Sequence, residues 1–127
     1  MAIRTELSLR LPNSPGALGR VCEQLAETHV NLLALHLESS GRLRLVVDNP
    51  LHAAAMLRER AHQVEEREVL VAALPNTPGT LGRLSRALTE AGINIEYAYA
   101  SSSDESPSTA IVLGVPDATK AAVVAGL

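Results

Sequence analysis

The sequence predicts an α+β fold made of two copies of one small unit. The first observation is an internal repeat: residues 11–20 (LPNSPGALGR) return as residues 74–83 (LPNTPGTLGR), 63 positions later. The two copies agree at 11 of the 21 positions from 11 to 31. The second observation is that alternating apolar and polar residues, typical of a strand, precede the motif, whereas apolar residues at helical spacing follow it. Self-similarity at a fixed period indicates two copies of one structural unit.

Composition limits the function classes. The chain has 127 residues, enough for one ordinary domain or two small units packed together. Its residues are 46% hydrophobic but only Tyr97 and Tyr99 are aromatic, so the core is expected to consist of Leu, Val, Ala and Ile. The chain has a net charge of −3 and lacks the clustered Lys and Arg that phosphate contacts require. A sheet that binds RNA needs exposed aromatic residues on which bases stack, and this chain has only two aromatic residues. Nucleic acid is therefore an unexpected partner.

Cysteine usage and hydropathy predict a cytoplasmic protein. Cys22 is the single cysteine, so no internal disulfide can form, which fits a reducing compartment. The first residues lack an apolar signal region, and no apolar run approaches the roughly 20 residues of a membrane-spanning helix.

The first strand and helix follow from local patterns. Residues 4–11 alternate, which predicts a strand with Leu7 and Leu9 on one face and Glu6 and Ser8 on a solvent-exposed face. Ser14 followed by a proline is typical of a helix N-cap and first helical position, so a helix is predicted from there to about residue 28. Its expected buried stripe, with that of the second copy, comprises Leu18, Val21, Cys22, Leu25, Leu81, Leu84, Ser85 and Leu88.

The rest of the first copy completes a six-element unit. Residues 30–38 and 42–47 are predicted strands joined by a turn at 39–41, a helix is expected over 51–61, and a fourth strand over 63–67. This order, βαββαβ, is that of a ferredoxin-like unit, in which two helices cover one face of a four-stranded antiparallel sheet. The predicted domains are residues 1–66 and residues 67–127.

The second copy departs from the first in two places. Its hairpin loop, residues 101–108, is longer, because matching Pro50 to Pro116 needs an offset of 66. Residue 127 aligns with residue 61, so the second unit lacks its last strand. We expect the uncovered edge of its first strand, residues 68–74, to pair with a partner chain or with the fourth strand of the first copy. Residues 32–37 are apolar on both faces, which also indicates a homo-oligomer, expected to be a homodimer.

The repeated turn between the first strand and the first helix is the candidate site. Unpaired N–H groups at a helix start suit a carboxylate, and Gly16 and Gly79 remove a side chain where a ligand would approach. The amides of Asn13 and Asn76 offer a donor and an acceptor, and the acceptor can take a hydrogen bond from an ammonium group. A zwitterion would satisfy both ends. The alternative is that these residues only make a turn and a helix cap.

This pattern resembles the ACT domain, an amino-acid-sensing regulatory module. The resemblance rests on Pro-Asn-(Ser/Thr)-Pro-Gly-x-Leu-Gly-Arg, followed after a helix by Val30-Asn31-Leu32 or Ile93-Asn94-Ile95, and it covers essentially the whole chain as a tandem pair. It implies that the two units pack side by side into a continuous antiparallel sheet with helices on one face, and that effectors bind between units.

The resemblance also implies the ligand-binding residues. The first Asn of each copy and the helix-start backbone would meet the polar head of the effector, and the second Asn would reach in from the adjacent unit. By pseudo-symmetry we expect Asn13 to pair with Asn94, and Asn76 with Asn31. Serine is not favoured as the effector, because serine-binding members carry a His where this chain has Leu11 and Leu74. The predicted ligand-binding residues are Asn13, Ser14, Gly16, Ala17, Leu18, Asn31, Asn76, Thr77, Gly79, Thr80, Leu81 and Asn94.

Other candidate residues carry weaker predictions. The four histidines (His29, His36, His52 and His62) lack the spacing of a metal site, so no metal and no cofactor are expected. Cys22 aligns with Ser85, which indicates a small packed residue and not a nucleophile. Tyr97 and Tyr99 share one face of a strand and either line the second site or fill the core.

The function that these patterns predict is regulation and not catalysis. A stand-alone protein would bind an amino acid between ACT units and modulate a partner enzyme or regulator in trans. The alternative is an assembly module in which the duplicated turn binds nothing. A phosphatase-like enzyme is disfavoured, because residues 13–16 contain no cation to stabilise transferring phosphoryl charge and Arg20 is expected to face solvent one helical turn away.

Overall fold

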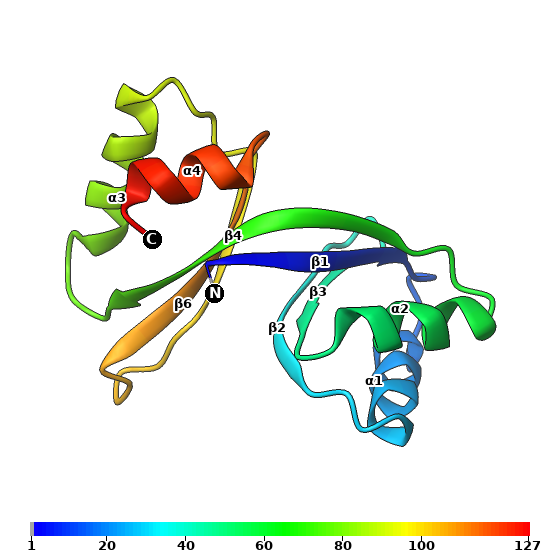
Figure 1. The fold of residues 1–127 in the computed structure, drawn as a ribbon. Coiled ribbons are helices and arrows are strands. Elements are labelled where there is room, and N and C mark those ends of the chain that lie inside the picture. The colour runs from blue at the N-terminus through cyan, green and yellow to red at the C-terminus, as the bar shows by residue number, and fades with distance from the viewer. Residues whose placement is uncertain (1) are drawn as a thin grey trace. The chain divides into compact units, whose positions relative to one another are not determined.

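The structure is a computed structural model that describes residues 2–127 (Figure 1). The chain forms two compact units. One contains Thr5–Arg67 and is called the first-copy unit. The other, called the second-copy unit, contains Glu68–Leu127 together with the N-terminal residues up to Arg4.

The first-copy unit has helices on one face of an antiparallel sheet. Its elements are β1 (Ile3–Arg10), α1 (Ala17–Glu27), β2 (Leu32–Leu37), β3 (Arg42–Val47), α2 (Pro50–Glu59) and the start of β4 (Glu65–Pro75). Strand β3 pairs with both β1 and β2, so β2 lies at the edge of the sheet (Figure 1). Leucines and valines of β1 and β3 pack against α1 and α2; the fully buried core residues include Leu7, Leu43 and Leu45 of the strands and Leu57 of α2.

The second-copy unit repeats this arrangement with β4, α3 (Thr80–Glu90), β5 (Tyr97–Ser101), β6 (Ser108–Gly114) and α4 (Ala118–Ala125). Strand β6 pairs antiparallel with β4 and with β5. Its core lies under α3 and α4 and includes Leu70, Leu88, Leu113 and Ala121, each fully buried. The predicted α+β class and ferredoxin-like order of elements are therefore confirmed.

The prediction about the uncovered edge of the second copy was wrong. The first strand of the second copy and the fourth strand of the first are one strand, β4. Its edge in the second-copy unit is covered by the start of β1, where the amide of Val71 donates to the carbonyl of Ala2 at 2.6 Å. The N-terminus of the chain therefore supplies the missing strand, and the edge of β4 no longer argues for an oligomer.

The predicted start of the first helix was also wrong. Helix α1 begins at Ala17 and its N-cap is Gly16, not Ser14. Gly16 has a φ of 87°, a left-handed conformation that glycine adopts without steric cost, and Gly79 has the same φ before α3. The turn therefore extends over residues 12–16, and the helix starts two residues later than Ser-Pro chemistry indicates.

The middle of the polar face of β1 is buried, whereas Arg10 at its end is exposed. Glu6 is 1% exposed and Ser8 is 7% exposed. The carboxylate of Glu6 accepts a hydrogen bond from Nη1 of Arg44 at 3.3 Å, and Arg44 lies on the neighbouring strand β3. A buried carboxylate needs such a partner, because an unpaired charge is costly to remove from water. The alternation of apolar and polar residues does not show whether the polar side chains face solvent or form a buried salt bridge.

Two smaller differences concern the helices. Helix α2 begins at Pro50, with Asn49 as N-cap accepting from the amide of His52. In α3 the predicted buried residue Leu81 is 42% exposed, and the buried stripe consists of Thr80, Leu84 and Leu88. Cys22 is half-buried beside the buried Val21 and Leu25.

Among residues 2–127, no helix has the length and apolar character that crossing a membrane requires.

Candidate functional site

The turn before α1 leaves backbone donors unpaired. The amide of Ser14 donates to the carbonyl of Pro12, that of Ala17 to Ser14, and that of Arg20 to Gly16. The amides of Leu18 and Gly19, between these, have no acceptor among the described residues. Because they lie at the positive end of the α1 dipole, these two amides are donors that suit an anionic acceptor such as a carboxylate.

Arg20 adds a cation to this turn. A Cβ placed on Gly16 would lie 3.3 Å from Nη1 of Arg20, so the guanidinium folds back over the helix start. The side chain is exposed, as expected, yet it points at the turn and not away from it. No carboxylate of the described residues lies within ion-pair distance of it. Arg20 is therefore a further candidate site residue, and its place in the repeated motif, four residues after the glycine, was the available sequence signal.

A cavity of about 150 Å³ lies beside this turn. Its lining combines the turn with the start of α1 and the end of β2. The side chain of Asn13 is exposed and makes no hydrogen bond with a described residue. Three leucines give the cavity an apolar wall, and Glu38 gives it a carboxylate. The lining residues that matter here are Leu11, Asn13, Ser14, Gly16, Ala17, Leu18, Leu37 and Glu38.

Glu38 is held in place by its neighbours. One carboxylate oxygen lies 3.8 Å from Nε of Arg44 and 3.8 Å from Nδ1 of His36, and the other accepts from the hydroxyl of Ser40 at 3.3 Å. The carboxylate remains 40% exposed. It therefore keeps capacity to accept a hydrogen bond from a cationic group that enters the cavity.

The corresponding turn of the second copy has a different environment. Nδ2 of Asn76 donates to the carbonyl of Ser103 at 2.8 Å and to that of Ser106 at 2.9 Å, and its backbone amide donates to Pro107. These acceptors belong to the long hairpin loop between β5 and β6. Both N–H bonds of the Asn76 amide are thus used within the unit.

The threonines of the second turn are also internally paired. The hydroxyls of Thr77 and Thr80 lie 2.9 Å apart, and the Thr80 hydroxyl donates to the carbonyl of Thr77. The first copy has Ser14 and Ala17 at these positions, so it lacks this pair. The backbone is otherwise the same, with the amides of Leu81 and Gly82 unpaired among the described residues and Arg83 folded back over Gly79.

The two predicted sites are therefore not equivalent. The polar side chains of the first turn are free beside a cavity, whereas those of the second turn are bonded to their own loop and to each other.

Asn31 and Asn94 lie outside these clusters. Asn31 directly precedes β2, and its backbone exchanges hydrogen bonds with Asp48 at 3.0 and 3.1 Å, while its side chain is exposed. Asn94 is exposed three residues before β5. The predicted pairing of Asn13 with Asn94 and of Asn76 with Asn31 stays a prediction.

Tyr97 and Tyr99 lie on the sheet face away from α3 and α4. Tyr97 is opposite Gly114 and Tyr99 is opposite Val112, neither of which belongs to the core under the helices. The rings stack with centroids 6.5 Å apart and an interplanar angle of 6°. The absence of a side chain on Gly114 leaves room for the ring of Tyr97.

Residues 2–127 contain no group of three or more His, Cys, Asp or Glu placed to hold a metal ion.

Comparison with known proteins identifies the second copy. The family model of the ACT domain matches residues 69–123. This segment is an ACT domain. The match covers most of the second-copy unit, and the first-copy unit repeats its motif and its order of elements. No curated protein sequence matches the chain.

Solved structures resemble the chain over nearly its whole length. The crystal structure of protein BT0572 from Bacteroides thetaiotaomicron has a TM-score of 0.88 and 29% identity, covering 97% of this chain and 86% of that one. The regulatory subunit of aspartate kinase from Thermus flavus has a TM-score of 0.71 and 17% identity, covering 98% and 88%. Aspartokinase III of E. coli, in complex with lysine and aspartate, has a TM-score of 0.65 and 20% identity, covering 98% and 30%. The last two share the fold.

Proposed function

We propose that this protein is a regulatory binding protein whose first-copy turn binds the polar head of a free amino acid. The observation that carries the proposal is a group of unpaired donors beside one cavity. The amides of Leu18 and Gly19 and the side chains of Asn13 and Arg20 have no partner among the described residues. Donors that are left unpaired in the free protein are available to a ligand.

Each end of an amino acid has a complement at this turn. The α-carboxylate would accept hydrogen bonds from the two helix-start amides and from Arg20, because a guanidinium and an N-terminal helix end both favour an anion. The α-ammonium would donate to the amide oxygen of Asn13 and to Glu38. The leucines of the cavity would contact the side chain, which favours an apolar amino acid over serine.

The second turn has the same unpaired amides, but its polar side chains are already bonded within the unit. A ligand at the second turn would have to replace the two hydrogen bonds from Asn76 to the loop and would find the Thr80 hydroxyl already bonded. Replacing satisfied hydrogen bonds gains little free energy, because the loop carbonyls then need new partners. We therefore expect one effector per chain, not two.

Strand β2 supports the expected homodimer. It is an edge strand, and Leu33, Leu35 and Leu37 are 38–41% exposed along it. Unpaired backbone groups and a row of exposed leucines favour pairing with another strand. Leu37 also lines the cavity, so a second copy that pairs with β2 would close the cavity over the effector.

Regulation would follow from this closure. An effector shifts an equilibrium only if it binds one arrangement better than another, and a ligand held between subunits binds the dimer better than the monomer. The partner would be an enzyme or regulator on which the protein acts in trans. The fold of an aspartate kinase regulatory subunit is consistent with this role.

The alternative function is an assembly module that binds no effector. The exposed leucines of β2 would then serve subunit contact alone. The two functions differ in whether the free donors of the first turn matter.

Isothermal titration with the amino acid that stabilises the protein most separates them. We expect one binding event per chain, an affinity about ten- to hundredfold lower in the Arg20→Gln variant because a charge-assisted hydrogen bond is lost, and an unchanged affinity in the matched variant Arg83→Gln. Two events per chain, or equal losses in both variants, would contradict the proposal of a single competent turn.

A further inference from the structure

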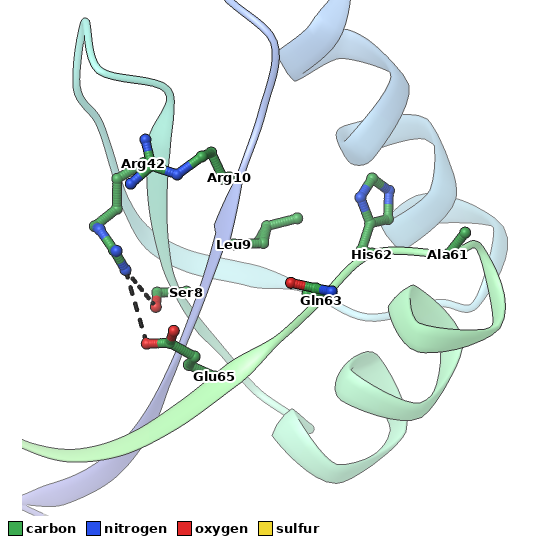
Figure 2. A pocket seen from close by; sticks show the side chains of 8 residues that line it. All are labelled: Ser8, Leu9, Arg10, Arg42, Ala61, His62, Gln63 and Glu65. Atoms are coloured by element: carbon green, nitrogen blue, oxygen red, sulfur yellow. Dashed lines mark hydrogen bonds and ion pairs between the residues drawn. The ribbon is translucent and has the colours of Figure 1, made fainter.

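A second cavity of the first-copy unit lies away from the turn at Asn13. Its volume is about 380 Å³, within the range of small-molecule sites. Figure 2 shows it between the end of β1 and the segment that leads into β4. Six of its eight lining residues carry polar side chains; the full set is Ser8, Leu9, Arg10, Arg42, Ala61, His62, Gln63 and Glu65.

Two arginines at this cavity lie directly opposite each other. Arg10 of β1 and Arg42 of β3 are partners in the antiparallel register. Like charges in directly opposite positions destabilise a sheet. The next pair on the same face is Ser8 and Arg44, and there the positive charge of Arg44 is balanced by the buried carboxylate of Glu6. The pair at the cavity has no buried carboxylate of this kind.

Within the unit, carboxylates balance the positive charges of Arg10 and Arg42 only weakly. Arg10 donates to the carbonyl of Ser40 at 3.1 Å, and no carboxylate of the described residues lies within 4 Å of it. Nη1 of Arg42 lies 3.8 Å from a carboxylate oxygen of Glu65, whose side chain is 79% exposed. Figure 2 marks this ion pair with a dashed line. An exposed pair at this distance contributes little, so the cavity carries an excess of positive charge.

Ser8 supplies a buried donor at the same cavity. Its side chain is more than nine-tenths buried, and its hydroxyl oxygen accepts from Nη1 of Arg42 at 3.3 Å. The hydroxyl proton has no acceptor among the described residues. A buried hydroxyl without an acceptor is costly, and an anion in the cavity would supply one.

We propose that this cavity is a second binding site, which takes a small molecule carrying a doubly charged oxyanion: a phosphate group or a pair of carboxylates. Two guanidinium groups provide planar forks of donors that match such oxygens, and Ser8 and Gln63 add neutral donors. Binding would relieve the repulsion between Arg10 and Arg42. The site is separate from the turn at Asn13 and does not depend on the amino-acid-binding proposal.

Inorganic phosphate and succinate are the probes, each titrated into the full-length protein at constant ionic strength with chloride as the reference salt. The readouts are the midpoint of thermal unfolding and the NMR shifts of the Ser8 backbone amide and the Gln63 side-chain amide. We expect a saturable rise of the midpoint and saturable shifts with at least one probe, and the probe that binds more tightly distinguishes phosphate from dicarboxylate chemistry.

Variants test which residues hold the anion. Arg42→Gln and Arg10→Gln should each weaken binding about ten- to hundredfold. The matched control, Arg86→Gln, removes an exposed charge from α3 and should change nothing. Asn13→Ala should also retain binding, which keeps this test apart from that of the amino acid site.

Absence of saturable shifts in the wild-type protein with both probes would overturn the proposal, as would equal weakening by Arg86→Gln, which would indicate general charge screening. Because the shift measurement uses the wild-type protein, a variant that fails to fold does not remove the test.

Discussion

The contrast between Asn13 and Asn76 gives a sharp prediction, because the two residues occupy the same position of the repeat and differ in their contacts. Asn13→Ala removes a side chain that makes no hydrogen bond with a described residue. Asn76→Ala removes two hydrogen bonds, of 2.8 and 2.9 Å, to the loop carbonyls of Ser103 and Ser106. Each substitution serves as the control for the other.

The magnitudes follow from these contacts. A hydrogen bond contributes about 0.5–1.5 kcal/mol, so the loss of two exposed ones should lower the free energy of unfolding by about 1–2 kcal/mol in Asn76→Ala. For a chain of this size that corresponds to a fall of roughly 3–8 °C in the unfolding midpoint. Asn13→Ala should change the free energy of unfolding by less than about 0.5 kcal/mol, as is usual for an exposed residue without special contacts.

Urea denaturation followed by circular dichroism measures both changes. Effector binding, measured by titration, should show the opposite order, with a large loss in Asn13→Ala and little change in Asn76→Ala. Equal destabilisation by the two substitutions would contradict this prediction, because Asn13 would then have a structural role like that of Asn76.

Three further predictions concern stability and assembly. Gly114→Ala places a Cβ where the ring of Tyr97 lies, so it should destabilise the protein by about 1–3 kcal/mol, and an unchanged thermal midpoint would show that the ring moves freely. Glu6→Gln leaves the guanidinium of Arg44 without its buried carboxylate and should cost about 3 kcal/mol in urea denaturation; a loss below about 1 kcal/mol would contradict a structural role for this pair. If the proposed dimer forms through β2, Leu35→Asp should convert it to a monomer in sedimentation experiments while the circular dichroism spectrum is retained, whereas a persistent dimer would exclude β2 as the interface.

Most of the fold is predictable from the sequence, because the signals that specify it are local. The repeated motif at Leu11 and Leu74, the alternation in β1 and the helical spacing of Val21 and Leu25 each depend on residues within a few positions. The pairing that completes the second-copy unit is not local. Ala2 bonds to Val71, and nothing in the residues around either position indicates that the N-terminus would provide the fourth strand.

The candidate site is predictable in position but not in detail. The turn and its glycines follow from the motif, but the contacts that distinguish the two copies depend on side-chain placement. The partners of Asn76 are carbonyl groups 27 and 30 residues away, and a carbonyl carries no sequence signal. The approach of Arg20 to Gly16 depends on a rotamer, which the residue type permits but does not dictate.

Thermal denaturation of the wild-type protein and of Asn13→Ala against each proteinogenic amino acid at millimolar concentration determines whether the first turn binds an effector. A ligand that binds only the folded state stabilises it by RT ln(1 + [L]/Kd), about 2.7 kcal/mol at a hundredfold excess over Kd. We expect a raised midpoint of the wild-type protein for one or two amino acids with apolar side chains, and no rise in Asn13→Ala. An unchanged midpoint with all of them would contradict the amino acid sensor and favour the assembly module.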